Sequence, residues 1–322
     1  MKTGLIAIFS LVVMVHICNA ATVAYYRFEE GTNGVLAAGT NSIIDRSGHG
    51  LNATPVVPPL YSNNVPVSPI LSNKLSLLFN GNATRIFIPD YPQLQLTNSL
   101  TLEAFIMALS YPQSSINESQ IFFRGDDEIG RDPYFIELRD TYLFFGISPG
   151  DPLVSVQAPI TLRQWHHVAG TLDGSTGNMR LYIDGNLVAS TNTALRPYQK
   201  LIGSNPGLGI GNVQSGNYAE YFNGFIDEAR ISDVALAPSQ FLNSAPSLKM
   251  NVPQLNSNGL LLGFDVISGN PQLFLLLQAS QLSGPWITNA GAILATNGSS
   301  SFSFQVSPAG TAPAQFYRIQ AR

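Results

Sequence analysis

Two adjacent histidines, His166 and His167, lie next to Trp165, one of only two tryptophans in this chain. A histidine pair can bind a metal ion or act as an acid/base couple. The side chains around the pair alternate as in a β-strand, where neighbouring residues point to opposite faces of the sheet. Both rings therefore cannot reach one metal ion without a bulge. We predict structural roles: one histidine faces the core beside Trp165 or Val168, and the other faces solvent or a second layer.

The carboxylates do not follow the pattern of a glycosidase, which needs two carboxyl groups facing one cleft. Glu137 and Asp140 are three residues apart and therefore lie on opposite faces of a strand. In the acidic pairs 29–30 and 227–228 the two residues are sequence neighbours, so in a strand they also point to opposite faces. Serine-hydrolase motifs and phosphate-binding glycine loops are absent from the sequence. The sequence predicts a protein that is not an enzyme.

The segment RGDDEIGRDPY, residues 124–134, is the densest acidic stretch of the chain. Its carboxylates are hard oxygen donors that could line a ligand or calcium site. The alternative is a solvated connection between two strands. Tyrosines in polar loops could stack against a sugar ring. Our candidate ligand-binding residues are Asp126, Asp127, Tyr134 and Tyr218.

Many short runs rich in Val, Ile, Leu, Phe and Tyr must position these residues. Gly, Pro, Asn and Asp bound the runs at a spacing typical of β-sandwiches. A helical pattern is limited to a short turn within residues 236–245. In the hairpin LYIDGNLVAS the turn is either Asp184-Gly185 or Gly185-Asn186, and the sequence leaves both open. The sequence predicts an all-β chain.

A domain boundary is expected at residues 243–247, where turn-forming residues follow the short helical pattern and strand patterns then resume. We predict a large β domain over residues 21–246. The remaining residues, 247–322, suit a small β-sandwich module.

The segment QWHHVAGTLDGSTGNMRLYIDGNLVAS resembles the signature of laminin-G-like jelly rolls, the concanavalin A-type lectin/glucanase fold shared with pentraxins. Further segments resemble the family in its own order: VAYYRFEEG, IIDRSGHGLNAT, LSLLFNGNATRIFIPD, SLTLEAFIMA and YFNGFIDEARISDVALAPSQF. The resemblance spans residues 23–242 and implies a concanavalin A-like antiparallel jelly-roll sandwich. The C-terminal part resembles a small β module that ends many secreted bacterial proteins. Because this fold serves lectins, adhesins, accessory modules and scaffolds, it predicts architecture more firmly than function.

The resemblance also implies that the first and last strands of the jelly roll pair, which would bring Glu29 or Glu30 and the Asp45 loop near Asp227. In GFIDEARI, strand alternation predicts that Asp227 shares a face with Phe225, Ala229 and Ile231. A carboxylate buried there needs a cation or several donors. We predict a structural calcium ion held by three carboxylates and by backbone carbonyls. The predicted ligands are Asp45, Asp227 and Glu30.

The alternative to a metal is a set of ion pairs at the same seam. Arg27 would pair with Glu228, or Arg230 with Glu30. The aspartate would then be satisfied by the amides of a turn.

The N-terminal segment MKTGLIAIFSLVVMVHICNA has the composition of a cleaved secretion signal, residues 1–20. Its apolar run is shorter than the roughly 20 residues that cross a bilayer, so we expect no membrane span after cleavage. Cleavage after Ala20 would remove the single cysteine. A secreted protein without disulfides must then depend on a large core.

The formal charge of −4, without any basic stripe, argues against nucleic acid as a partner. We predict a secreted, non-catalytic protein that recognises carbohydrate or another extracellular polymer. The alternative is a structural or adhesive surface protein that binds protein partners. A glycoside hydrolase with an unrecognised site is the third hypothesis.

Overall fold

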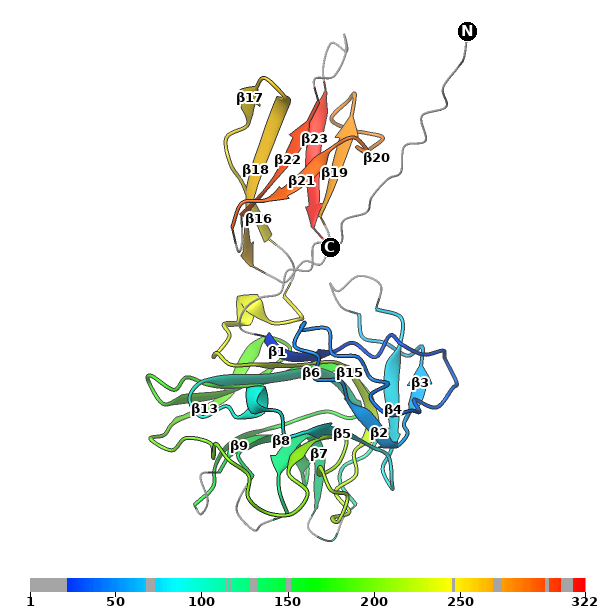
Figure 1. Cartoon of the computed structure of the whole chain (residues 1–322), viewed down its shortest axis with the longest axis vertical. Helices are drawn as coiled ribbons and strands as arrows, with labels where there is room; N and C mark the ends of the chain where they lie inside the picture. Colours follow the sequence, from blue (N-terminus) through cyan, green and yellow to red (C-terminus); the bar gives the residue numbers. More distant parts are fainter. Residues whose placement is uncertain are drawn as a thin grey trace. The chain divides into compact units, whose positions relative to one another are not determined.

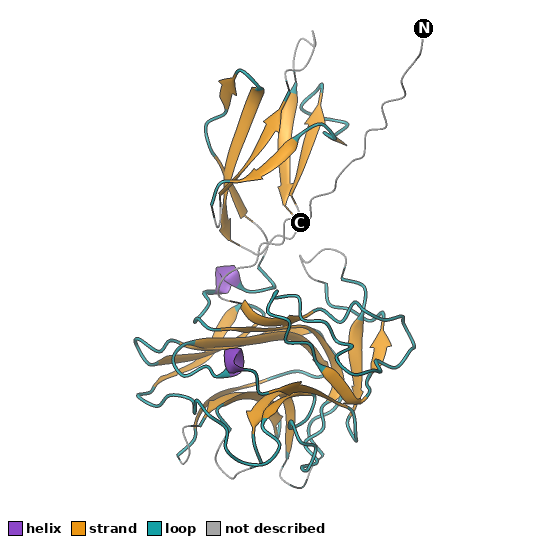
Figure 2. Ribbon diagram, in the orientation of Figure 1, coloured by secondary structure: helices purple, strands orange, loops and turns teal. Residues whose placement is uncertain are grey.

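The structure, a computed structural model, describes residues 22–67, 73–113, 115, 117–127, 132–148, 152–244, 247–268, 274–298, 301–307 and 315–321. The predicted secretion signal lies outside these residues. The chain divides near residue 247 into two compact units, each built of antiparallel sheets (Figure 1). Strands dominate both units, with two short 3-10 helices, η1 (Pro92–Leu94) and η2 (Pro238–Gln240), in the described part of the chain (Figure 2). The all-β prediction is therefore confirmed.

The first unit is a sandwich of two sheets. The eight-stranded sheet has the order β13 (Asn186–Asn192), β12 (Asn178–Ile183), β11 (His166–Leu172), β6 (Leu100–Ala108), β15 (Asn223–Ser232), β4 (Ser76–Asn80) and β3 (Leu60–Ser62), and β1 (Thr22–Tyr26) also pairs with β15. The seven-stranded sheet has the order β10 (Val154–Pro159), β9 (Tyr142–Ile147), β8 (Tyr134–Arg139), β7 (Glu118–Gly125), β14 (Gly207–Ile210), β5 (Arg85–Pro89) and β2 (Thr54–Val57).

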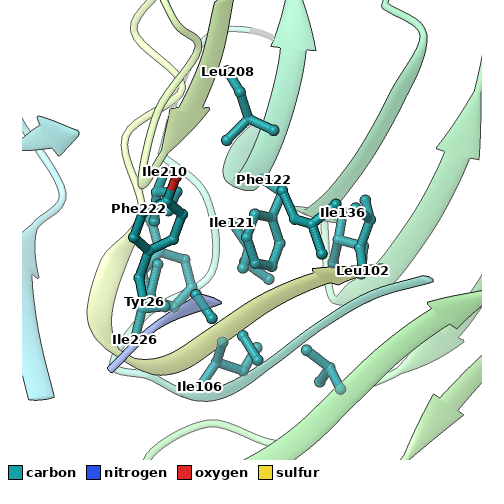
Figure 3. Packing of buried hydrophobic residues seen from close by; sticks show 14 of the residues in the cluster. Tyr26, Leu102, Ile106, Ile121, Phe122, Ile136, Leu208, Ile210, Phe222 and Ile226 are labelled. Carbon is teal, nitrogen blue, oxygen red and sulfur yellow. The ribbon is translucent and has the colours of Figure 1, made fainter. Parts of the chain in front are cut away.

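The hydrophobic core of this unit lies between the two sheets. Figure 3 shows part of it, with Ile106 and Ile226 from the eight-stranded sheet and Phe122, Ile136 and Leu208 from the seven-stranded sheet. The core forms because strand alternation sends every second side chain inward. In β8, for example, Tyr134, Ile136 and Leu138 belong to the core. The intervening side chains of β8 therefore lie on the outer face of the seven-stranded sheet.

The last strand of the sandwich, β15, departs from the alternation that the sequence predicts. Its register with β6 shifts between Asp227 and Arg230, and Glu228 has a φ of 49° within this bulge. Ala229 and Ile231 consequently belong to the core, whereas Asp227 and Arg230 pair with residues on the outer side of β6. The prediction that Phe225, Asp227, Ala229 and Ile231 share one face is wrong because the bulge reverses the alternation.

The hairpin of β12 and β13 resolves the turn that the sequence left open. Ile183 pairs with Asn186, and both Asp184 and Gly185 have positive φ angles of 53° and 79°. Asp184-Gly185 is therefore the two-residue turn, in a conformation that matches the twist of a hairpin.

The second unit contains a five-stranded and a three-stranded sheet. The first has the order β16 (Ser247–Met250), β18 (Gly259–Ser268), β22 (Ser301–Val306) and β21 (Ile293–Thr296), with β17 (Gln254–Asn256) paired to β18; the second has the order β20 (Ile287–Thr288), β19 (Phe274–Ala279) and β23 (Phe316–Ala321). Its own core contains stacked and edge-on phenylalanine rings. Among the described residues, neither short helix has the length and apolar character to cross a membrane.

Candidate functional site

The two histidines lie on opposite faces of β11, as predicted. His166 lies opposite the core residue Ile106 of β6 in the strand register. Its ring Nδ1 is 2.8 Å from Asp184 Oδ2, and its Nε2 is 2.7 Å from the Thr161 hydroxyl. His167 lies on the outer face, where its Nε2 is 2.8 Å from Glu103. These hydrogen bonds give each ring a structural role and no shared ligand.

Glu103 is the centre of a buried polar cluster on the outer face of the eight-stranded sheet. Arg230 Nε donates to Glu103 Oε1 at 2.6 Å, and the Leu242 backbone N–H donates to Oε2 at 2.9 Å. Burial acts to raise the pKa of Glu103, but Arg230 and His167 hold it below its usual value. Arg230 also donates to the carbonyl of Gln240 at 2.8 Å. The cluster thus fastens the segment after β15 to the sheet.

Asp45, the first predicted calcium ligand, is engaged by the turn that contains it and by the strand β1. Its Oδ1 accepts the backbone N–H groups of Tyr25 and Ser47, at 3.0 and 2.8 Å. Its Oδ2 accepts the Ser47 hydroxyl at 2.7 Å and the Leu51 N–H at 3.0 Å. This is the arrangement expected of an aspartate satisfied by turn amides.

The other two predicted calcium ligands have separate partners. Asp227 accepts the Glu228 N–H at 2.8 Å and the Asn73 side-chain amide at 2.9 Å. Glu30 pairs with Arg46 at 3.2 Å. Their oxygens and those of Asp45 are not among the described groups that converge closely enough to hold one ion. Each of the three residues therefore has hydrogen-bond or ion-pair partners of its own, and the calcium ion predicted for them stays a prediction.

Of the ion pairs considered as the alternative, one is present. Arg27 Nε bonds Glu228 Oε1 at 3.0 Å, and the Tyr25 hydroxyl donates to Glu228 as well. Arg230, expected to pair with Glu30, pairs instead with Glu103. An open groove of about 450 Å³ next to this seam is lined by Arg27, Glu29, Gly31, Thr32, Lys74 and Leu75.

The predicted ligand-binding aspartates hold loops in place. Asp126 is buried and its Oδ2 accepts the backbone N–H groups of residues 202 and 203. Asp127 accepts the side-chain amides of Asn205, Gln214 and Asn217 at 2.7 to 2.9 Å. Asp127 thereby ties together the loop before β14 and the loop after it.

The two predicted tyrosines have opposite environments. Tyr134 is wholly buried in the core and donates its hydroxyl to the Leu94 carbonyl at 2.7 Å, so it cannot stack against a ligand. The expectation was wrong because β8 begins at Tyr134, which is therefore not a loop residue. Tyr218 is 47% exposed and belongs to residues 211–222, the loop that Asp127 helps to hold.

A cluster of carboxylates that the sequence did not indicate lies on the outer face of the seven-stranded sheet. Among the described residues, Glu118, Glu137 and Glu220 each offer an oxygen, and these oxygens lie within 4.8 Å of one another. Glu118 and Glu137 belong to neighbouring strands, β7 and β8, whereas Glu220 comes from the 211–222 loop. We call these three residues the glutamate cluster.

Two side chains connect the glutamate cluster. The Gln120 amide nitrogen donates to Glu137 Oε2 and to Glu220 Oε2, both at 2.6 Å. Arg139 pairs with Glu118 at 2.6 Å and with Glu137 at 2.7 Å. Strand register explains these contacts, because Gln120 lies opposite Glu137 and Glu118 lies opposite Arg139.

Burial makes the carboxylates of the glutamate cluster hard to ionise. It raises the pKa of Glu137 to about 8, with the Glu118 carboxylate adding to the effect. Burial also raises the pKa values of Glu118 and Glu220, although Gln120 partly offsets the rise for Glu220. Buried like charges of this kind need a proton or a cation.

Comparison with known proteins places the large unit in a family. A family model described as the concanavalin A-like lectin/glucanases superfamily matches residues 80–240. None of the curated proteins compared with the chain matches it.

Several solved structures are similar to the chain. The binding domain of Paraclostridial Mosquitocidal Protein 1 matches with a TM-score of 0.51 and 14% identity, over 77% of this chain and 64% of that domain. The chain thus spans less than two thirds of that structure. A second match is domain 4 of AbnA, a GH43 extracellular arabinanase from Geobacillus stearothermophilus, in complex with arabinotriose. Its TM-score is 0.44 and its identity 20%, over 68% of this chain and 95% of that domain. The binding domain of Botulinum Neurotoxin DC in complex with SialylT matches with a TM-score of 0.48 and 12% identity, over 90% of this chain and 86% of that chain.

Proposed function

The chain belongs to the concanavalin A-like lectin/glucanases superfamily, and on this premise we propose that it is a secreted, non-catalytic module that recognises carbohydrate. The observation that carries the proposal is the exposed Tyr218 on the loop whose exposed Asn217 is bonded, together with the exposed Asn205, to one aspartate. Both amides donate to Asp127, at 2.9 and 2.7 Å. A sugar ring can stack on an aromatic face while fixed amides and carboxylates bond its hydroxyl groups.

The hydrogen bonds of the 211–222 loop, which carries Tyr218, support a binding role because they order this loop in the absence of a ligand. Gln214 donates to Asp127 at 2.9 Å, and Asn212 donates to the Tyr218 carbonyl at 3.0 Å. A loop that is already ordered loses less conformational entropy on binding. This arrangement favours a small recognition surface formed by residues 205, 217 and 218.

The glutamate cluster supports a non-catalytic role. Glu137 is only 1% exposed, and its two oxygens are engaged by Arg139 and Gln120. A hydrolase needs carboxyl groups that face its substrate across a cleft. A sugar could not reach Glu137 without displacing these partners.

Glycan-array binding by the chain without residues 1–20 tests the proposal. We expect the wild type to bind one class of glycan, and Tyr218→Ala to bind it about tenfold less tightly, as expected when about 1.4 kcal/mol of contact is lost. Tyr142→Ala, which removes another exposed tyrosine, is the matched control and should bind normally. Equal binding by wild type and Tyr218→Ala would contradict this site.

A protein-binding, adhesive role is the second candidate, favoured by the edge strand β13. Leu187 and Val188 of β13 are 53% and 41% exposed. An edge strand with exposed apolar side chains is a typical place for another chain to pair. If the array shows no glycan, loss of protein binding in Val188→Lys would support this candidate instead.

A further inference from the structure

We propose that the glutamate cluster binds one calcium ion, which fastens the 211–222 loop to the outer face of the seven-stranded sheet. Glu118, Glu137 and Glu220 would be the carboxylate ligands, and Gln120 the amide ligand. This site is separate from the residues 45, 227 and 30 that the sequence pointed to.

The spacing of the carboxylate oxygens suits a single ion. Calcium binds oxygen at about 2.3–2.6 Å, so two ligands of one ion lie at most roughly 4.6–5.2 Å apart. The oxygens of Glu118, Glu137 and Glu220 all fall within 4.8 Å of one another. This spacing matches that of three ligands of one ion, once the Gln120 nitrogen that now contacts Glu137 and Glu220 turns away.

Gln120 provides a second, independent indication of a ligand. It is wholly buried, its nitrogen contacts both Glu137 and Glu220, and its Oε1 has no hydrogen-bond partner. A buried amide oxygen without a partner is costly. A half-turn of the amide would direct this oxygen at the carboxylates, which is favourable once a cation lies between them. Calcium commonly takes such amide oxygens together with carboxylates.

The charges at the site also call for a cation. Arg139 is the guanidinium that pairs with Glu118 and Glu137, so three ionised carboxylates would leave two negative charges unbalanced. A divalent ion would neutralise them. The ligands are all oxygens, which suits calcium and not zinc, for which nitrogen and sulfur ligands are typical.

The consequence of binding would be local order in the loop that carries Tyr218. Glu220 is two residues from Tyr218, and its carbonyl already accepts the Gln120 backbone N–H at 2.9 Å. An ion shared by Glu220 and the strands β7 and β8 would add a further link between loop and sheet, beside the hydrogen bonds that Gln120 makes to Glu220.

Calcium binding to the chain without residues 1–20, in the absence of any sugar, tests the inference. Isothermal titration with calcium chloride should show one ion per chain, and calcium should raise the melting temperature relative to chelator. Glu220→Gln and Glu137→Gln should weaken calcium binding by about tenfold or more, because each removes a charged ligand. Asp233→Asn, which removes an exposed carboxylate, and Asp227→Asn, which tests the seam, should bind calcium like the wild type.

The absence of calcium binding by the wild type, or unchanged binding by Glu220→Gln, would overturn the proposal. Tighter binding of magnesium than of calcium would overturn the choice of ion. If Glu137→Gln does not fold, Glu220→Gln decides, because its side chain comes from a loop. Since no sugar is present, failure here is distinguishable from failure of glycan recognition by Tyr218.

Discussion

At the scale of single residues, Glu228 links the stability of the protein to pH. It is buried at the bulge of β15 and bonded to Arg27 and Tyr25. Burial raises its pKa to about 7, although Arg27 and Tyr25 act to lower it. Burial also raises the pKa of the adjacent Asp227, and the Glu228 charge adds to that rise. The folded protein therefore holds protons that the unfolded chain releases.

This linkage predicts that stability falls as pH rises. The unfolded glutamate has a pKa of about 4.3, so the contribution of Glu228 is complete below that pH and is lost as pH rises through about 7. We expect the melting temperature, measured by calorimetry in chelator, to decrease between pH 5 and 8. Glu228→Gln should make the decrease less steep because glutamine cannot ionise. An unchanged slope in Glu228→Gln, with Asp233→Asn as the exposed control, would contradict this assignment.

At the scale of strands, the outer face of the seven-stranded sheet depends on a glycine that leaves room for a ring. Gly146 of β9 lies opposite Phe135 of β8, and a Cβ at Gly146 would overlap the Phe135 ring. That ring also packs against Phe123, with centroids 6.2 Å apart. Phe135 can cover the sheet only because its neighbour has no side chain.

We therefore expect Gly146→Ala to destabilise the protein by roughly 1–3 kcal/mol, the usual cost of overpacking. Urea denaturation would measure the change. Adding Phe135→Leu should recover part of the loss, because the smaller side chain can move aside. Gly291→Ala is a suitable control, since the nearest atom to its Cβ would be the Asn289 Oδ1 at 3.6 Å. No recovery in the double variant would argue against the steric explanation.

Side-chain alternation explains which parts of the fold and site could be predicted. It identified β11 and placed its two histidines on opposite faces, because that inference needs only local sequence. It failed at β15, where Glu228 adopts a left-handed conformation that glutamate rarely takes. It also missed the glutamate cluster. Glu118 and Gln120 share a face by simple alternation, but Glu220 is 100 residues from Gln120 and joins them only through the folded 211–222 loop.

At the scale of the whole molecule, the two units have separate cores of different kinds. The larger core is a mixed aliphatic and aromatic cluster between two extended sheets. The smaller is centred on Phe264, whose ring lies 5.0 Å from Phe274 and 5.7 Å from Phe302. Among the described residues, no buried side chain belongs to both cores. Each unit therefore has its own source of cooperativity.

We predict that calorimetry will show two transitions that respond to different substitutions. Phe264→Ala should cost about 3–5 kcal/mol, a large part of the stability of a unit of about 75 residues. It should lower the midpoint temperature of one transition, or abolish that transition, and leave the other transition unchanged. Phe122→Ala, a wholly buried ring of the larger core, should have the opposite selectivity. A single transition that both variants lower equally would show that the units unfold together. Calcium should then raise the midpoint temperature of only the transition that Phe122→Ala affects, because every proposed ligand belongs to the larger unit.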